Sequence, residues 1–414
     1  MTESLPACRF CGAPLRTTFV DLGETPLANS YVTPDDIAAG RDKRYPLHVR
    51  VCDACFLVQA DEPVHPDAIF SDYAYFSSYS SSWVEHARRY AEAMRARFAL
   101  GPDSLVVEIA SNDGYLLQHF VAAGVPVLGV EPAANVAAVA VAKGVPTEVA
   151  FFGRDTALRL AARGYAADLM AANNVLAHVP NLADFTGGFS LLLKPEGVAT
   201  FEFPHLLNLI KQVQFDTIYH EHFSYLSLVA VERVFAGSGL RVFDVEELST
   251  HGGSLRLFAG LAGSAHVETE RLRAMRAKEH AAGLDSIEAY RGFPARVAAV
   301  KASFLAFLAK AKAEGKRVAA YGAAAKGNTF LNVCGVTLAD IVAVADRSAA
   351  KQGKWLPGSH IPILAPEAIR DIRPDYLVVL PWNLIDEIRS EMAFIADWGG
   401  RFVTGVPETR VLAA

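Results

Sequence analysis

The sequence predicts an α/β protein with a mostly parallel central sheet, a small cysteine-rich module before it and a second α/β unit after it. Two observations support this. From residue 104 onward, and again in roughly the last hundred residues, short apolar strands alternate with helical stretches. This alternation is typical of parallel sheets covered by helices. Two C-x-x-C pairs stand near the N-terminus, before the alternation begins.

Length and composition limit the function classes. A chain of 414 residues suggests two or three domains at roughly 150 residues each. Hydrophobic residues make up 52% and charged residues 20%, as in soluble globular enzymes. The net charge of −6, without a long run of Lys or Arg, argues against nucleic acid or an anionic membrane as partner. The start lacks a secretory pattern, and no apolar run reaches the ~18 residues of a membrane span. We expect a cytoplasmic protein.

The first module has the ligands of a zinc site. Cys8, Cys11, Cys52 and Cys55 form two C-x-x-C pairs, and four thiolates close a tetrahedral shell around Zn²⁺. Such a site has no open position and is structural. Unrelated buried thiols, or disulfides, are the alternative, and disulfides are rare in the cytosol. The fifth cysteine, Cys334, stands alone between apolar neighbours and is expected in the core.

The elements follow in order along the chain. Strands are expected around the second cysteine pair, in "YPLHVRVCDACFLVQ". A segment rich in Tyr and Ser then leads into an amphipathic helix that ends near residue 100. The stretch 104–204 contains strand–helix pairs, and residues 241–260 alternate like an antiparallel hairpin at a sheet edge. A long helical stretch over about 265–312 precedes the second α/β unit.

The first strand–helix turn of the central unit, "VVEIASNDGYLL" (106–117), is a candidate ligand site. Backbone N–H groups and a helix N-terminus there can face a ligand. Glu131 ends the next strand, where an acid can accept two ribose hydroxyls. Of the glycines that pyrophosphate binding requires, only Gly114 is present; Ala110 and Asn112 stand where two others are expected. S-adenosylmethionine fits better than NAD, although a plain strand–helix turn without a cofactor is the alternative.

The motifs together resemble those of the S-adenosylmethionine-dependent C-methyltransferases that act at C3 of nucleotide-linked 4-keto-deoxysugars. The resemblance rests on the cysteine pairs and on "YAYFSSYSSSWVEH", "EIASNDGYLL", "NNVLAHV", "FEFPHL", "YHEHFSYLS", "HGGSLR" and "YGAAAKGNT", and it spans nearly the whole chain. It implies a zinc-binding domain (1–65), a Rossmann-like S-adenosylmethionine-binding methyltransferase domain (66–265) and a C-terminal α/β domain (266–414) that contributes to nucleotide-sugar binding.

The resemblance also implies site residues. Cofactor contacts are expected from the turn, from Glu131 and from the end of a later strand: Glu108, Ala110, Asn112, Gly114, Tyr115, Leu116, Asn173 and Asn174. The last two could instead contact the sugar or be amides that cap the loop. Carbon methylation next to a ketone needs a base, a donor for the enolate oxygen and exclusion of water. The expected catalytic residues are His222 as base, Glu221 as its partner, Tyr219 as enolate donor, His178 and Tyr73.

The "YHEH" cluster has two other interpretations. His220 and His222 could share a metal, although H-E-x-x-H spacing is missing. The cluster could also be a capping network at the start of a helix. Candidate substrate contacts are Tyr75, Tyr79, Trp83, His205, Lys326, Asn328 and Lys351, with helix capping, turn formation or helix–strand packing as the alternatives.

The function expected from all of this is C3 methylation of a 4-keto-6-deoxysugar nucleotide, with dTDP as the expected carrier, through an enolate. Two other functions stay open at this point: O-methylation of a sugar nucleotide, and nucleotide-sugar binding without turnover. An NAD-dependent sugar enzyme is disfavoured by the missing glycines.

Overall fold

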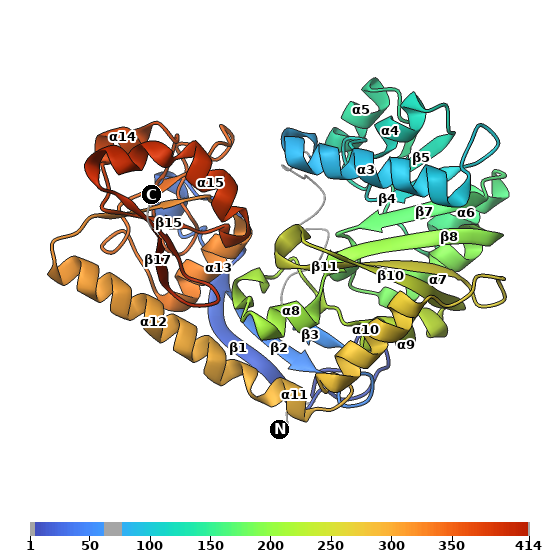
Figure 1. Cartoon of the computed structure of the whole chain (residues 1–414), viewed down its shortest axis with the longest axis horizontal. Helices are drawn as coiled ribbons and strands as arrows, with labels where there is room; N and C mark the ends of the chain where they lie inside the picture. The colour runs from blue at the N-terminus through green and yellow to red at the C-terminus, as the bar shows by residue number, and fades with distance from the viewer. Residues whose placement is uncertain (1–4, 62–76, 413–414) are drawn as a thin grey trace.

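The computed structural model describes residues 5–61 and 77–412, and these form three sheets with their covering helices (Figure 1). Tyr73 and Tyr75 lie outside the described residues. The three sheets follow the predicted order along the chain, with one exception: a strand from the middle of the sequence joins the N-terminal sheet.

The N-terminal sheet is antiparallel, in the order β1-β2-β3-β9. It contains β1 (Thr17–Pro26), β2 (Arg44–Val51), β3 (Val58–Ala60) and β9 (Ser224–Tyr225). The short helix α1 (Pro34–Ala38) starts at a capping box, in which Thr33 and Asp36 each bond the other's backbone N–H. The fourth strand, β9, comes from the stretch that contains the "YHEH" motif.

The central sheet has the order β10-β11-β8-β7-β4-β5-β6. The five strands from β8 to β6 are parallel, and β10 and β11 form the predicted antiparallel hairpin at one edge. The bounds are β4 (Val106–Ile109), β5 (Val127–Val130), β6 (Thr147–Glu148), β7 (Ala167–Asn173), β8 (Leu193–Pro204), β10 (Leu240–Leu248) and β11 (Ser254–Leu261).

Helices cover both faces of this sheet, as the alternation predicts (Figure 1). One face packs against α3 (Ser81–Phe98), α4 (Leu117–Ala122) and α5 (Ala134–Ala142). The other face packs against α6 (Arg154–Ala162), α7 (Leu182–Leu192), α9 (Leu228–Gly237) and α10 (Glu270–Ala281). Ser80, Ser227 and Thr269 each cap the helix that follows by accepting a backbone N–H.

The C-terminal sheet has the order β14-β13-β12-β15-β16-β17, parallel except for β17. Its strands are β12 (Val318–Tyr321), β13 (Val344–Ala345), β14 (Ile363–Leu364), β15 (Tyr376–Val379), β16 (Arg401–Thr404) and β17 (Arg410–Leu412). The helices around it are α12 (Phe293–Ala313), α13 (Ala325–Cys334), α14 (Ala368–Ile372) and α15 (Ile385–Glu391).

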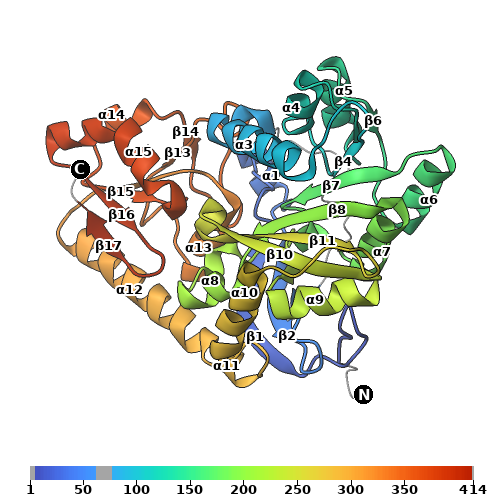
Figure 2. The same cartoon turned by 45° about the vertical axis from the view of Figure 1, so that its right-hand side comes forward.

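The N-terminal and C-terminal sheets share one hydrophobic core. Phe19 of β1 stacks on Phe293 of α12, with ring centroids 4.4 Å apart, and Phe215 lies 5.9 Å from Phe330 of α13. The helix α12 runs along the outside of both sheets (Figures 1 and 2). The cysteine-rich module therefore packs against the C-terminal unit as well as against the central one.

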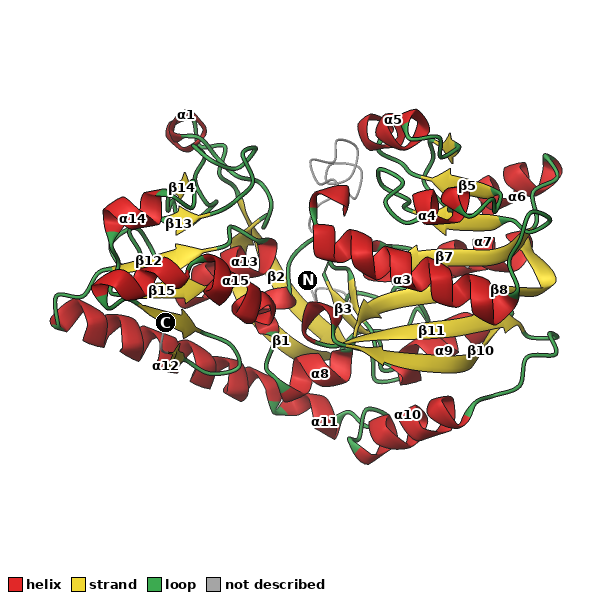
Figure 3. Ribbon diagram, turned by 45° about the horizontal axis from the view of Figure 1, so that its top comes forward, coloured by secondary structure: helices red, strands yellow, loops and turns green. Residues whose placement is uncertain are grey.

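The predicted long helical stretch is interrupted. It consists of α10, the short α11 (Glu288–Arg291) and α12, and α8 (Leu206–Lys211) lies near its middle (Figure 3). Contrary to the sequence-based expectation, one described helical stretch, Glu288–Ala313, is long and apolar enough by composition to cross a membrane, with a hydropathy of 1.3. Only 28% of the apolar window in this stretch is buried, and Val297, Val300 and Phe304 lie on the face that packs against the core shared by the two sheets, so we interpret it as a helix that covers this core with one face.

Candidate functional site

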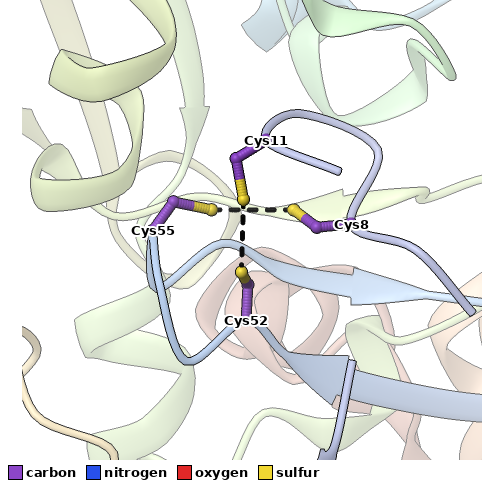
Figure 4. Close-up of side chains that lie close together, drawn as sticks. All are labelled: Cys8, Cys11, Cys52 and Cys55. Carbon is purple, nitrogen blue, oxygen red and sulfur yellow. Dashed lines mark hydrogen bonds between the residues drawn. The ribbon is translucent and has the colours of Figure 1, made fainter. Parts of the chain in front are cut away.

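The four predicted zinc ligands come together (Figure 4). All four Sγ atoms lie within 4.8 Å of one another, with Cys8–Cys55 at 3.6 Å and Cys11–Cys52 at 3.5 Å. The edge of a tetrahedron with Zn–S bonds of 2.3 Å is about 3.8 Å, so the donors fit a zinc ion. The described residues contain no other cluster of three or more potential ligands of this kind. Cys334 is buried in the core, as predicted.

The turn after β4 has the left-handed backbone conformation that glycine usually adopts. Ala110, Asn112 and Gly114 all have positive φ, at 53°, 50° and 77°. The two positions where glycine was expected therefore adopt the left-handed conformation without it. A Cβ at Gly114 would meet Val145 at 3.0 Å, so this glycine also permits close packing against the end of α5.

Two buried carboxyl groups flank this turn. Glu131 accepts the backbone N–H of Asn112 with Oε2 and that of Ala133 with Oε1, both at 2.9 Å. Burial raises the pKa of Glu131, and the two N–H groups act against this shift. Burial also raises the pKa of Glu108 well above its usual range, and Tyr115 contacts it. Leu116 is in the core of the sheet.

The ends of β7 and β8 add polar groups to the same edge of the sheet. Asn173 ends β7; its Oδ1 is buried and accepts no hydrogen bond from the described residues. Asn174 has φ 56°, and its Nδ2 lies 3.3 Å from Nε2 of His251. Parallel strands place their carboxyl ends at one edge, where ligands of such sheets bind. The predicted residues that follow or end β4, β5 and β7, namely the 110–114 turn, Glu131, Asn173 and Asn174, therefore lie at this same edge.

Glu202 of β8 is the centre of a buried network that the sequence analysis missed. Its Oε2 accepts hydrogen bonds from His86 Nε2 at 3.0 Å and from Arg256 at 2.9 Å, and its Oε1 accepts one from Thr250 at 3.1 Å. Hydrogen bonds and the positive charges of His86 and Arg256 lower the pKa of Glu202 despite burial. The glutamate in "FEFP" was the visible sign, since a charge in a buried strand needs partners.

Trp83 links this network to the turn after β4. Its ring stacks on His86, with centroids 4.8 Å apart, and lies 6.1 Å from Tyr115 and 5.5 Å from His251. Tyr79, in contrast, is 81% exposed. Of these two candidate substrate contacts, Trp83 is the one that lies among the site residues.

The "YHEH" motif is a turn that precedes β9, neither a strand nor the start of a helix. The ring of His222 lies 4.0 Å from that of Tyr219 and 4.7 Å from that of His178. The N–H of Phe223 donates to the carbonyl of Ala177 at 2.8 Å, which ties the turn to the segment that carries His178. The structure thus brings three of the predicted catalytic residues together.

Backbone contacts fix the tautomers of both histidines. His222 Nδ1 lies 2.9 Å from the carbonyl oxygen of Thr217, and His178 Nδ1 lies 2.7 Å from that of Glu221. A carbonyl only accepts, so each Nδ1 is the protonated nitrogen and each Nε2 has the lone pair in the neutral ring. Burial lowers the pKa of His178 to about 4, and burial with the nearby His178 lowers that of His222 well below its usual range.

The other members of the motif point elsewhere. His220 Nε2 donates to the carbonyl of Pro46 at 3.2 Å, on the N-terminal sheet, so His220 and His222 do not face a common metal. The buried carboxylate of Glu221 accepts a hydrogen bond from Asn29 at 3.2 Å, while its carbonyl orients His178. The expected direct pairing of Glu221 with His222 is therefore replaced by a contact with His178.

The C-terminal unit contributes Lys326, in the first turn of α13. Its Nζ donates to Asn383 at 2.7 Å and lies 5.0 Å from the ring centroid of Trp382. Trp382 in turn donates to Asp216 at 2.7 Å, and burial raises the pKa of Asp216 to about 6. The positive charge of Lys326 acts on both His222 and His251, which places it near the catalytic candidates.

The remaining candidates have protein partners. Lys351 Nζ donates to the carbonyl of Ala323 at 2.9 Å, and Asn328 is buried with its Oδ1 accepting from Asn332. His205 is buried and its Nε2 lies 2.7 Å from Glu279, so we assign it a structural role. The glycines of "HGGSLR" permit close approach of protein groups: a Cβ on Gly252 would lie 2.4 Å from Trp382.

A parallel sheet with a left-handed turn after its first strand and a buried acid after its second is the arrangement that the sequence led us to expect of a methyltransferase domain. Family models agree, matching a "Putative zinc binding domain" over 8–70, a "Methyltransferase domain" over 83–245 and a "C-methyltransferase C-terminal domain" over 249–407. The curated protein "C-methyltransferase NovU" of Streptomyces niveus is 39% identical over 414 residues, 100% of this chain and 98% of that protein. The chain belongs to this family of S-adenosylmethionine-dependent C-methyltransferases.

Solved methyltransferase structures are similar to part of this chain. An S-adenosylmethionine-dependent methyltransferase from Clostridium acetobutylicum is 12% identical, with a TM-score of 0.36, and the match covers 43% of this chain and 92% of that one. Magnesium protoporphyrin IX methyltransferase from Synechocystis, with bound S-adenosylmethionine, is 16% identical, with a TM-score of 0.32 and coverage of 43% and 80%.

Proposed function

We propose that the protein methylates C3 of a nucleoside diphosphate 4-keto-6-deoxysugar, with dTDP as the expected carrier, through an enolate, and that it acts in the cytoplasm. The observation that supports this most directly is the pair of neutral imidazoles, His178 and His222, with Tyr219 beside them. A proton α to a ketone is removed by a base whose lone pair is free at the working pH. Burial lowers the pKa of both rings, which keeps their lone pairs free near pH 7 and also lowers their basicity.

His222 is the proposed base. Its Nδ1–H is held by the carbonyl of Thr217, so Nε2 takes the proton from C3. The electron pair of the broken C3–H bond moves into the enolate, whose oxygen at C4 accepts a hydrogen bond from the Tyr219 hydroxyl. S-adenosylmethionine, when bound, supplies an electrophilic methyl group. C3 gains the methyl, the C4 carbonyl re-forms, and S-adenosylhomocysteine leaves as the second product.

The proposed cofactor contacts are Glu131, the turn from Ala110 to Gly114, and Asn173 and Asn174. Lys326 is the proposed diphosphate contact, because its amine is positively charged and half-buried near His222 and His251. Lys351 is a weaker candidate, since its charge is already paired with the carboxylate of Asp346 at 3.6 Å. Trp83, beside the cofactor turn, is the proposed stacking residue.

The test is mass spectrometry of reactions in deuterated water with S-adenosylmethionine and dTDP-4-keto-6-deoxyglucose, its 2-deoxy relative or its 3-amino relative. One methyl gained, with exchange of the C3 proton in reactions without the methyl donor, is the expected result. Methylation without C3 exchange would indicate an O-methyltransferase. Binding of the sugar nucleotide with neither reaction would indicate a binding protein.

The variant His222→Asn removes the proposed base and keeps a polar side chain of similar reach. We expect it to lose most C3 exchange and to bind S-adenosylmethionine like the wild type. The exposed His280, paired with Asp285 far from this cluster in sequence, provides the control variant His280→Asn. Equal C3 exchange in both variants would exclude His222 as the base.

A further inference from the structure

A loop of the N-terminal module reaches both the catalytic candidates and the C-terminal unit. This loop, residues 27–32, follows β1. Ser30 donates its N–H to Leu27 at 3.2 Å, which closes a turn. Val32 exchanges two backbone hydrogen bonds with Trp355 of the C-terminal unit, at 3.0 and 2.8 Å. The 27–32 loop is therefore held at one end by the segment that follows β13.

The loop contacts Glu221 through Asn29. Nδ2 of Asn29 donates to Oε1 of Glu221 at 3.2 Å, although the two residues are 192 positions apart. Glu221 is buried, and its Oε2 accepts no hydrogen bond within the described parts of the chain. Asn29 is thus the side chain that stabilises the ionised form of a carboxyl group whose pKa burial raises.

The loop contacts the C-terminal unit through Tyr31. Its hydroxyl donates to the carbonyl of Ala323 at 2.6 Å, and Lys351 donates to the same oxygen at 2.9 Å. The N–H of Ala323 donates to Asp346 at 2.8 Å. Ala323 belongs to the turn between β12 and α13, three residues before Lys326. Tyr31 is therefore attached to the turn that presents the proposed diphosphate contact.

We propose that Asn29 is a positioning residue for Glu221, and that Tyr31 fixes Asn29 by anchoring the 27–32 loop to the turn before α13. The inference depends on the proposed function, because Glu221 matters here through its carbonyl, which holds His178 Nδ1. Asn29 holds the carboxylate of the same residue. Loss of either contact lets Glu221 turn and moves His178 relative to His222.

The test uses Asn29→Ala, Tyr31→Phe, the double variant and Ser30→Ala as the control in the same loop. Steady-state methylation and C3 exchange without methyl donor are measured for each, together with the Kd of S-adenosylmethionine and the Tm. Loss of a hydrogen bond to a buried charged group changes an equilibrium or rate constant by roughly a factor of ten to a hundred. We expect Asn29→Ala to lower kcat and C3 exchange about tenfold or more, while KM, Kd, Tm and the Ser30→Ala control change little.

Tyr31→Phe should give a smaller loss of kcat, and the double variant should be no slower than Asn29→Ala. The effects of substituting two residues that act through the same contact do not add up. In a plot of the C3 exchange rate against pH, the fall on the acid side should also move to higher pH in Asn29→Ala. The reason is that the pKa of Glu221 rises when its hydrogen-bond donor is removed. The other titratable groups around Glu221 are the hydroxyls of Tyr31 and Tyr225 and the rings of His178 and His222.

Two outcomes would overturn the inference: a kcat for Asn29→Ala equal to that of Ser30→Ala, or additive losses in the double variant. A loss of kcat in Asn29→Ala that is accompanied by a comparable loss of Tm would also overturn the inference, since it would show a structural role for Asn29. Failure of the proposed function would look different, because the wild type itself would then show no C3 exchange.

Discussion

Ala60 of β3 donates its backbone N–H to the carbonyl oxygen of Phe223, the residue after His222, at 3.1 Å. Arg9, between the first two zinc ligands, donates to the carbonyl of Ala60 at 2.7 Å, and its guanidinium lies 5.3 Å from the ring centroid of Phe223. Val58 and Gln59 of β3 pair with the two residues of β9. Backbone hydrogen bonds therefore connect the zinc module directly to the turn that carries the proposed base.

Removal of zinc should abolish methyl transfer and leave cofactor binding largely intact. Without the metal, the four cysteines no longer hold the two C-x-x-C pairs together, and the position of β3 against β9 is lost. The turn after β4, which we propose as the cofactor site, belongs to the central sheet and has none of these contacts. Cys52→Ser, or chelation, is measured by zinc content, methylation rate and calorimetric titration with S-adenosylmethionine.

Cys334→Ala is the matched control, because this thiol is buried in α13 and away from the cluster. The Cys334→Ala variant should keep the zinc content and the methylation rate of the wild type. Full activity in zinc-free protein would show that the module has no part in positioning His222.

The sequence predicts the central sheet well because its pattern is local. Each strand and its following helix show their own periodicity, so β4, α4, β5 and α5 appear where the alternation places them. The strand β9 could not be found this way. It has two residues, and its partner β3 lies about 165 positions earlier, so its pairing depends on tertiary contacts.

The site shows the same division. The zinc ligands form two C-x-x-C pairs, and the "YHEH" residues are consecutive, so both motifs can be recognised from their spacing in the sequence. Asn29, His86 and Glu202 do not, because the contacts Asn29–Glu221 and His86–Glu202 join residues 192 and 116 positions apart. Positive φ at Ala110 was hidden as well, since alanine seldom adopts that conformation.

Glu131→Gln should weaken binding of S-adenosylmethionine. The carboxylate accepts one backbone N–H with each oxygen, and an amide presents its NH₂ group to one of these donors. The unsatisfied donor lowers the stability of free and bound protein alike, whereas a ribose hydroxyl that donates to an amide instead of a carboxylate loses charge assistance of roughly 1–2 kcal/mol. We expect the Kd to rise about fivefold to thirtyfold in calorimetric titrations.

Glu148→Gln serves as the control for this experiment. Glu148 ends the neighbouring strand β6 and pairs with the exposed Arg163 at 2.8 Å. Its removal should leave the Kd unchanged. A similar Kd for wild type and Glu131→Gln would place the ribose elsewhere.

The contribution of His178 and His251 to stability should fall as the pH is lowered from about 7 toward 4. Burial lowers the pKa of His178 and of His251 to about 4, whereas unfolded histidine has a pKa near 6.5. The unfolded chain therefore binds more protons over this window, and protonation favours unfolding. In thermal unfolding at pH 7.5, 6.0 and 5.0 this histidine contribution should fall steadily, while the raised pKa values of Glu108, Glu131 and Asp216 act in the opposite direction.

His178→Asn should reduce this dependence, because one neutral buried ring is removed. The difference in Tm between pH 7.5 and 5.0 should be smaller than in the wild type. His280→Asn, at an exposed site, should match the wild type. Equal pH dependence in His178→Asn would show that His178 is protonated as easily in the folded protein as in the unfolded chain.

Glu202→Gln should destabilise the protein strongly, because Glu202 is the completely buried member of an ion-pair network. Its side chain is 0% exposed and that of Arg256 is 7% exposed, with 2.9 Å between them. Removing one charge of a buried pair costs about 3–5 kcal/mol, since the other charge stays buried. Arg256 keeps Glu246 at 3.1 Å, so we expect a loss of about 3 kcal/mol in urea unfolding.

Glu246→Gln is the matched control at the outer end of the same network. Its side chain is 26% exposed, and partly exposed ion pairs contribute about 1 kcal/mol or less. Glu202 also accepts from His86 and Thr250, so Glu202→Gln should loosen Trp83, which stacks on His86, and the turn that carries His251. We therefore expect weaker quenching of Trp83 fluorescence only in the Glu202 variant. Equal free energies of unfolding for the two variants would mean that water or a rearranged partner satisfies Arg256 when Glu202 is neutral.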